Sequence, residues 1–506
     1  MSQPQANITI AAPGFAGINT EISPTIQADQ YAAIAENCII DEYGRLGSRK
    51  GMRLLSTDAT AIGGAAIQSI HAHLDVLGVE TVLCAADNKI FKGLTTPVDA
   101  TPVGATITGN DWQMTSFNDD CFMFQEGHTV LQYDASIDTV VEVAGIPEGS
   151  CATAAYGRLW VAGVAGSDNI VHWSALLDGT DFVGGDTGTI NVEEYWPTGY
   201  DTIVGMKGHN DRLIIFGEEN ILVFTNVTGD IAGTDGIRLE DAVRGIGCMA
   251  RRTIVGIGTD VLFLDRTGLR SLGRTLTQTS LPIGDVSQNV ASAVTASVNQ
   301  ETAPNEISAI YSAAEALYLL IFRTSGTVFC FSTRQPEQTG AFKTTTWPVP
   351  TTGAFAIDKT GGLLIGGSMG LIGQYDGYDD LGESYKLRYF TNPLSFGDST
   401  KLKFPKQVDF TLLVGSSGDA LITWAFDYGR TTRSRRVVLA GSGNYGYYGE
   451  AEFNEVEYSG GNNLVRRKAN IGGSGVVVAL GIELDILGDA FSIQEINIQT
   501  LIGRIT

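Results

Sequence analysis

The fold is decided by the stretch Lys207–Thr225, KGHNDRLIIFGEENILVFT. A polar turn around His209 and Asp211 precedes the apolar run Leu213–Phe216, and a second apolar run, Ile221–Phe224, follows four small or polar residues. Runs of four branched or aromatic residues, with so few polar ones between them, do not suit a helix. They predict two antiparallel strands of a buried hairpin.

The same unit recurs along most of the chain from residue 61 onward. Each copy has a short strand, a polar turn, an apolar strand, a turn that usually holds Gly or Asn, and a third strand. The copies end at Gly93, Asp134, Ser174, Thr225, Gly273, Ser332 and Gly377. A period of roughly 40–50 residues with three or four strands per copy is typical of a β-propeller. Seven copies predict about seven blades, with six or eight as alternatives; an elongated solenoid or a row of sandwiches would have shorter or more regular repeats.

The segments on either side of the repeats have a different rhythm. We expect an N-terminal arm at 1–60, the propeller at 61–380, and a C-terminal β-sandwich or barrel at 385–506, where strands alternate apolar and polar residues. Within the arm, Ala28–Glu36 predicts a short helix, Cys38–Ile40 a strand and Asp41–Gly44 a turn. Because a propeller closes by bringing its first and last blades together, the arm should pack against the C-terminal domain.

The composition narrows the function classes. The formal net charge is -23 with a pI near 4.6, which argues against high-affinity binding of nucleic-acid phosphates. We see no signal-peptide pattern and no apolar run long enough to span a membrane. The cysteines are far apart and predict buried free thiols rather than disulfides or metal ligands: Cys38, Cys84, Cys121, Cys151, Cys248 and Cys330.

A search for chemistry returns no catalytic, cofactor-binding or metal site. His71 and His73 would share one face of a strand, but no acidic or cysteine partner stands at a telling spacing, so we expect a surface pair without metal. No Gly-x-Ser-x-Gly elbow occurs, and GGSMGLIG at 366–373 is a hairpin rather than a phosphate loop.

The opening segment is more specific than the repeats. GINTEISP at 17–24 precedes Asn37, Ile40 and the turn that runs from Asp41 through Gly44 to Leu46, Arg49 and Gly51. This pattern resembles the start of the tail nozzle proteins of short-tailed bacteriophages (podoviruses), also called tail tubular protein B-like proteins. The motif covers about a tenth of the chain, and the propeller with appended β domains is compatible with that family.

The resemblance implies a structural virion protein rather than an enzyme. It would form a homo-hexameric ring in the phage tail below the portal and its adaptor protein, contact tail fibres or a distal tip protein, and continue the channel through which duplex DNA passes during ejection. Assembly would occur in the host cytoplasm. The alternatives are a propeller-based receptor-binding module and a polysaccharide-degrading enzyme.

Two sets of residues are the candidates for these roles. Basic side chains of the two terminal segments would contact the adaptor or neighbouring copies: Arg45, Arg49, Lys50, Arg53, Arg433, Arg435 and Arg436. Acidic turns would line the channel and repel DNA phosphates: Asp119, Asp120, Glu218 and Glu219.

Overall fold

The computed structural model describes residues 5–58, 60–228, 231, 236–277, 284–349, 353–414, 419–429, 431–439 and 463–503. The chain divides into two compact units. The propeller unit holds Leu54–Val328 and Val349–Gln374, and the terminal unit holds Met1–Arg53, Phe329–Pro348 and Tyr375–Thr506. The division differs from the expected boundaries, because it passes through strands β6 (Met52–Leu54), β28 (Thr327–Ser332) and β32 (Ile372–Tyr375).

The propeller unit contains four complete antiparallel sheets whose strands follow the chain order. Blade 1 is β7 (Ser69–Leu74), β8 (Glu80–Ala86), β9 (Lys89–Lys92) and β10 (Val98–Asp99). Blade 2 is β11 (Gln113–Phe117), β12 (Asp120–Phe124), β13 (Val130–Asp134) and β14 (Thr139–Val143). Blade 3 is β15 (Gly149–Ala155), β16 (Arg158–Val164), β17 (Ile170–Trp173) and β18 (Gly188–Asn191). Blade 4 is β19 (Ile203–His209), β20 (Arg212–Gly217), β21 (Asn220–Thr225) and β22 (Arg238–Arg244).

Three shorter blades complete this unit. Blade 5 is β23 (Val255–Gly256), β24 (Val261–Asp265) and β25 (Gly268–Ser271), followed by helix α1 (Leu272–Thr277). Blade 6 contributes β26 (Ile307–Ser312) and β27 (Leu317–Phe322), and blade 7 is β30 (Ala354–Ile357), β31 (Leu363–Gly366) and β32. The other helical pieces are α2 (Ala291–Val298), η1 (Thr60–Ile62), η2 (Glu193–Tyr195), η3 (Arg251–Thr253), η4 (Asp285–Ser287), η5 (Pro304–Glu306) and η6 (Ser368–Gly370). The prediction of an all-β propeller with about seven blades is confirmed.

The hairpin β20–β21 shows why such sheets stack. All eight residues of its two apolar runs are at most 1% exposed, because each face is covered by a different neighbour. Leu213, Ile215 and Phe224 pack with Trp160 and other residues of blade 3. The alternate side chains, Ile214, Phe216 and Val223 among them, pack with Val261 and Phe263 of blade 5. Alternation along each strand therefore buries both faces only when blades stand on both sides.

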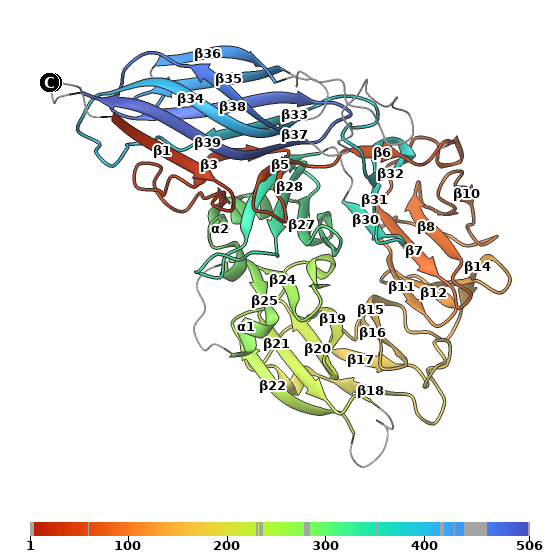
Figure 1. Cartoon of the computed structure of the whole chain (residues 1–506). Helices are drawn as coiled ribbons and strands as arrows, with labels where there is room; N and C mark the ends of the chain where they lie inside the picture. Colours follow the sequence, from red (N-terminus) through yellow and green to blue (C-terminus); the bar gives the residue numbers. More distant parts are fainter. Residues whose placement is uncertain are drawn as a thin grey trace. The chain divides into compact units, whose positions relative to one another are not determined.

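The stack of blades closes on itself. Ile70, Val82 and Phe91 of blade 1 share one apolar cluster with Ala354, Leu364 and Ile372 of blade 7. The first strands of successive blades also contact one another around the ring (Figure 1). An elongated solenoid would leave these two end sheets apart, so that alternative is wrong.

The terminal unit is built from two sheets. The first has the order β37 (Asn463–Asn470), β34 (Lys403–Val414), β39 (Phe491–Ile502), β5 (Leu46–Ser48) and β4 (Cys38–Ile40), with β1 (Gln5–Ala11) also on β39. The second, within this unit, has the order β29 (Lys343–Pro348), β2 (Gly17–Ile18), β3 (Tyr31–Glu36), β33 (Tyr385–Thr391), β38 (Val478–Ile486), β35 (Asp419–Phe426) and β36 (Thr431–Val438). Burial alternates along β35, as expected for a sandwich strand with one covered face.

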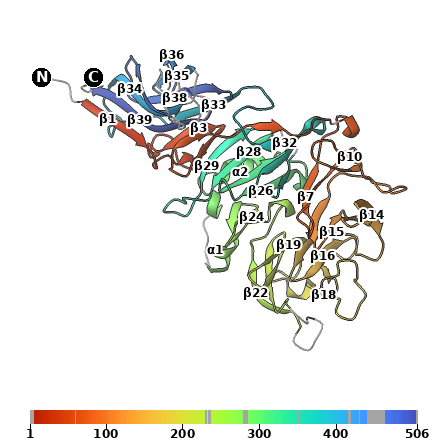
Figure 2. The same ribbon diagram turned by 45° about the vertical axis from the view of Figure 1, so that its right-hand side comes forward.

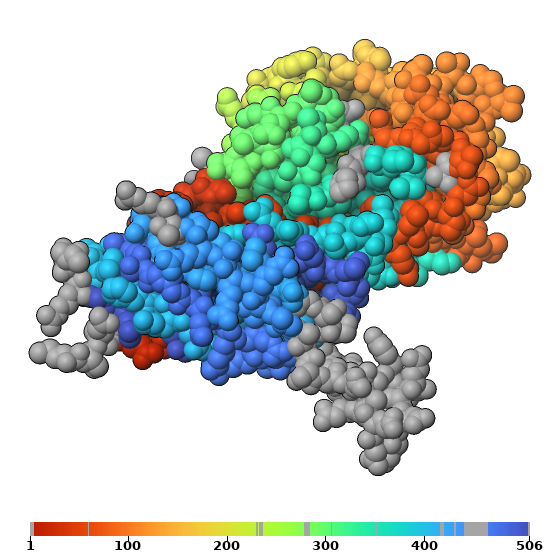
Figure 3. Space-filling view, turned by 90° about the horizontal axis from the view of Figure 1, so that it is seen from above, coloured from red at the N-terminus to blue at the C-terminus, as the bar shows by residue number. Residues whose placement is uncertain are grey.

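The N-terminal segment is woven into the C-terminal strands, which confirms the expected packing. Strand β1 pairs with β39 over its whole length, from Gln5 opposite Leu501 to Ala11 opposite Glu495 (Figure 2). In Figure 3 the red N-terminal segment lies against the blue C-terminal strands. The predicted helix at Ala28–Glu36 is wrong: Tyr31–Glu36 is β3, paired with β2 and β33. Tertiary pairing overrides the helix preference of alanine here, since Ala32 and Ala35 are fully buried in the sheet.

Candidate functional site

The residues behind the N-terminal resemblance form an internal joint of the terminal unit, centred on Arg49. Its Nη1 and Nη2 donate to the two carboxylate oxygens of Asp380 at 2.9 and 2.6 Å, and its Nε donates to Oδ1 of Asn37 at 2.8 Å. The guanidinium lies 4.1 Å from the ring centre of Tyr385. Because the Arg49 side chain is only 2% exposed, it cannot make the adaptor or ring contact predicted for it.

The glycines of the same motif are required by close backbone approaches. A Cβ on Gly51 would lie 1.8 Å from the carbonyl oxygen of Asp379. Gly17 has a φ of +79°, and a Cβ there would lie 2.1 Å from the carbonyl oxygen of Thr344. The turn Asp41–Gly44 is confirmed, with the Gly44 amide donating to the Asp41 carbonyl at 3.0 Å.

The other basic candidates fall into two groups. Near the joint, Arg45 pairs with Asp41 at 2.6 Å, and Arg53 pairs with Asp376 at 3.2 Å in an exposed position; Lys50 is partly exposed. Arg433, Arg435 and Arg436 are exposed together on β36, the last strand of its sheet. Within the described residues, β35 is the only strand paired with β36, so the structure gathers these three arginines along one sheet edge.

The acidic candidates are not brought together. Asp119 and Asp120 lie at the first turn of blade 2, and Glu218 and Glu219 lie at the second turn of blade 4. Consecutive turns of an antiparallel meander lie at opposite ends of its strands. Glu218 and Glu219 also pair with Arg266, at 3.6 and 3.2 Å, which offsets part of their charge. Asp119 and Asp120 are half-buried.

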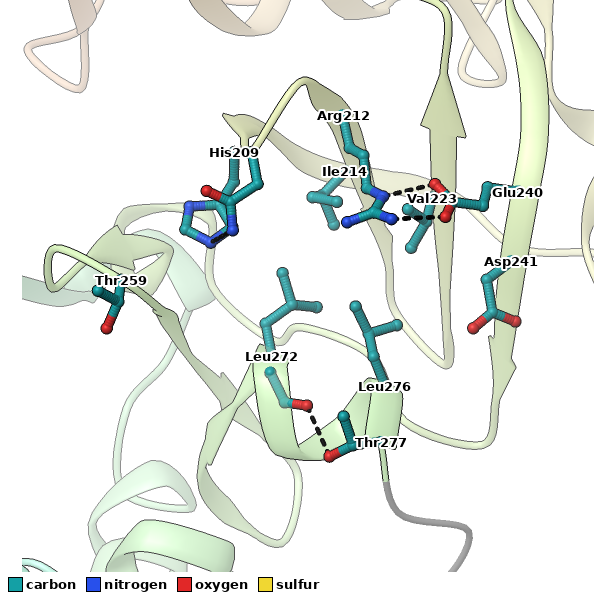
Figure 4. A pocket seen from close by; sticks show the side chains of 12 residues that line it. His209, Arg212, Ile214, Val223, Glu240, Asp241, Thr259, Leu272, Leu276 and Thr277 are labelled. Carbon is teal, nitrogen blue, oxygen red and sulfur yellow. Dashed lines mark hydrogen bonds and ion pairs between the residues drawn. The ribbon is translucent and has the colours of Figure 1, made fainter.

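A cavity of about 300 Å³ lies between blades 4 and 5 (Figure 4). Leu272 and Leu276 of α1 point toward Ile214 and Val223 and make its apolar floor. The other lining residues are mostly polar and lie at turns or on β22: His209, Asn210, Arg212, Glu240, Asp241, Thr259, Gly273 and Thr277.

The charged pair at the rim of this cavity favours binding over acid–base chemistry. Arg212 donates from Nε and Nη2 to both oxygens of Glu240, at 2.5 and 2.6 Å. The hydrogen bond from Arg212 lowers the pKa of Glu240, whereas a general acid for glycoside cleavage needs a raised pKa. The polysaccharide-degrading alternative therefore finds no support in this pair.

A second polar group lies on the first strands of blades 1 and 2. Nε2 of His73 is 3.1 Å from the carbonyl oxygen of Asp119 and must donate to it. Nδ1 of His73 then accepts from the Ser116 hydroxyl at 2.9 Å, and that oxygen accepts from Nε2 of His71 at 2.8 Å. The expected surface position is wrong for His73, which is fully buried. Ser116 and Asp119 could not be found from the spacing of the two histidines.

Acid should weaken the fold through His71. Burial, and then the neighbouring His73, lower the pKa of His71 to about 4, from about 6.5 in the unfolded chain. The unfolded state therefore takes up the proton first, so stability is complete above pH 6.5 and falls by roughly 2–3 kcal/mol toward pH 4. His71→Gln, which keeps a donor to Ser116, should flatten this part of a urea-denaturation profile against pH. His128→Gln is the matched control; parallel curves for His71→Gln and wild type would contradict the assignment.

The six cysteines are all free and buried, as predicted. No group of three or more His, Cys, Asp or Glu side chains suited to a metal ion is found in the part of the chain that the structure describes. Among the same residues, none of the helices is long and apolar enough to cross a membrane.

Comparisons with known proteins add little. No family model and no curated protein matches the chain. Among solved structures, YCF48 bound to D1 peptide matches at 10% identity and a TM-score of 0.35, over 62% of this chain and 92% of that one. BamB from Moraxella catarrhalis matches at 11% and 0.37, over 74% and 98%. The Neurospora crassa Pan2 WD40 domain matches at 8% and 0.38, over 65% and 95%. Similarities this weak carry no argument about function.

Proposed function

We propose that this chain is a structural virion protein, the tail nozzle of a short-tailed bacteriophage. Six copies form a ring below the portal and adaptor, and the ring continues the channel for DNA ejection. Its role is assembly and passage rather than catalysis.

The observation that supports the proposal most is the joint around Arg49. The residues that resemble the nozzle motif each have a specific task there: Gly17 and Gly51 permit close backbone contacts, Asp41 and Gly44 form a turn, and Arg49 binds Asp380. A chance resemblance would scatter such residues over unrelated turns and surfaces. The motif instead specifies how the N-terminal segment joins the C-terminal strands.

The exposed edge of β36 supports docking to a protein partner. Its three arginines have no ion-pair partner among the described residues, in a chain with a net charge of -23. An unpaired sheet edge offers backbone hydrogen bonds to an added strand, and arginines favour acidic partners. We therefore assign adaptor or neighbour contacts to Arg433, Arg435 and Arg436, and not to Arg49.

Negative-stain electron microscopy of the purified chain, alone and with its adaptor, tests the proposal. Closed six-fold rings are expected.

A further inference from the structure

The propeller unit contains an arginine cluster at its axis. Arg252, on η3 at the start of blade 5, donates from Nη1 to the carbonyl oxygen of Gln68 at 3.0 Å and from Nη2 to Oγ of Ser69 at 2.8 Å. Arg251 binds Oδ2 of Asp111 at 3.0 Å, and Arg252 pairs with the other oxygen of that carboxylate. Gln68 and Ser69 begin blade 1 and Asp111 precedes blade 2, neither of which adjoins blade 5. Blades that are not neighbours can meet only near the axis of the ring.

A third guanidinium, that of Arg323, joins this cluster from the end of β27 in blade 6. Burial lowers the pKa of Arg252 to about 10, and the positive charges of Arg251 and Arg323 lower it further against the opposing effect of Asp111. Burial likewise lowers the pKa of Arg323, while Asp111, Glu306 and Glu301 raise it. The three cations are therefore close enough to repel one another.

The cluster holds more positive than negative charge. Three guanidiniums share the single carboxylate of Asp111, and within the described residues no ion pair joins Arg323 to an acid. The carboxylate of Glu301 is occupied by the amides of Thr324 and Ser325, and that of Glu306 by Thr302 and Ala303: the bonds are 2.8–3.4 Å long.

Spare donors remain at this position. Nε of Arg251 and Nε of Arg323 are buried and find no acceptor among the residues that the structure describes. A buried guanidinium without a full set of acceptors is costly, and an anion would reduce both that cost and the repulsion. The side chains of Arg251, Arg252 and Asp111 are still 19%, 15% and 20% exposed, so solvent reaches the cluster.

We propose that Arg251, Arg252 and Arg323 form a binding site for a small oxyanion of the phosphate class at the propeller axis. The planar guanidinium forks match tetrahedral oxyanions with paired N–H donors. The bound anion ties blades 1, 2, 5 and 6 together across the axis through residues that already contact one another there. This site goes beyond the proposed role in the phage tail and does not depend on it.

Isothermal titration calorimetry of the full chain with inorganic phosphate, at constant ionic strength in sodium chloride, tests the site. Wild type should bind with a Kd on the order of 1 mM or tighter, and Arg323→Met should weaken binding at least about tenfold. Arg323→Lys, which keeps the charge, should fall between the two and serves if Arg323→Met does not fold. The control Arg266→Met removes an exposed arginine from a turn of blade 5 and should bind like wild type.

Absence of saturable phosphate binding by wild type, or equal affinity in both Arg323 variants and wild type, would overturn the site. A second arm identifies the source of the phosphate group. Competition by a short single-stranded oligonucleotide that is lost in the Arg323 variants assigns the site to a nucleic-acid backbone. Phosphate binding without such competition assigns it to the free ion.

Discussion

Replacing Arg49 by Met should destabilise the terminal unit by about 3 kcal/mol, because Asp380 would keep its charge without its partner. The side chain of Asn37 and the ring of Tyr385 would lose contacts as well. Hydrogen exchange measured by mass spectrometry should show the loss of protection first in β3, β4 and β33, which surround the joint. Protection within blades 1–4 should change little.

Arg53→Met is the matched control for this experiment. Arg53 also pairs with an aspartate, Asp376, but the two side chains are 59% and 45% exposed. An exposed pair contributes less than about 1 kcal/mol. If Arg53→Met and Arg49→Met cost the same, the joint does not hold the N-terminal segment as described.

Reversing the charge of Arg433, Arg435 and Arg436 to Glu should weaken attachment to the acidic partner about 100-fold, since like charges would then face one another along the docking edge. The three side chains are exposed, so the fold should be unaffected. Attachment can be measured by co-sedimentation with adaptor-bearing, DNA-filled heads. Arg49 is left out of this variant because a carboxylate buried beside Asp380 would disrupt the joint itself.

The control for the charge reversal is a second exposed edge strand. Arg238→Glu with Arg244→Glu changes β22, the last strand of blade 4, where both positions are exposed. This control should attach normally. Undiminished attachment by the β36 variant would move the docking surface elsewhere.

The seven blades could be predicted because hairpins such as β20–β21 are buried on both faces and leave a strong local signal. The fourth strands were harder to see. β14, β18 and β22 lie at the exposed ends of their sheets, and their polar residues resemble loops. Strand β3 was missed for another reason: its alanines favour a helix locally, and only pairing with β2 and β33 makes it a strand.

The sites were less predictable than the fold. A count of basic residues could not separate buried Arg49 from exposed Arg435, because burial of Arg49 depends on Asp380, which is 331 residues away in sequence. The axial cluster is similar, since Asp111 and Arg251 are 140 residues apart and no spacing rule links them. The net charge of -23 describes the whole surface and hides this local excess of positive charge.

Negative-stain electron microscopy of the wild-type chain with its adaptor tests the proposed function most directly. The account predicts closed rings of six copies that stack coaxially on the adaptor and leave an open central channel. A monodisperse monomer that neither forms rings nor binds the adaptor, at concentrations where the adaptor itself is assembled, would contradict it.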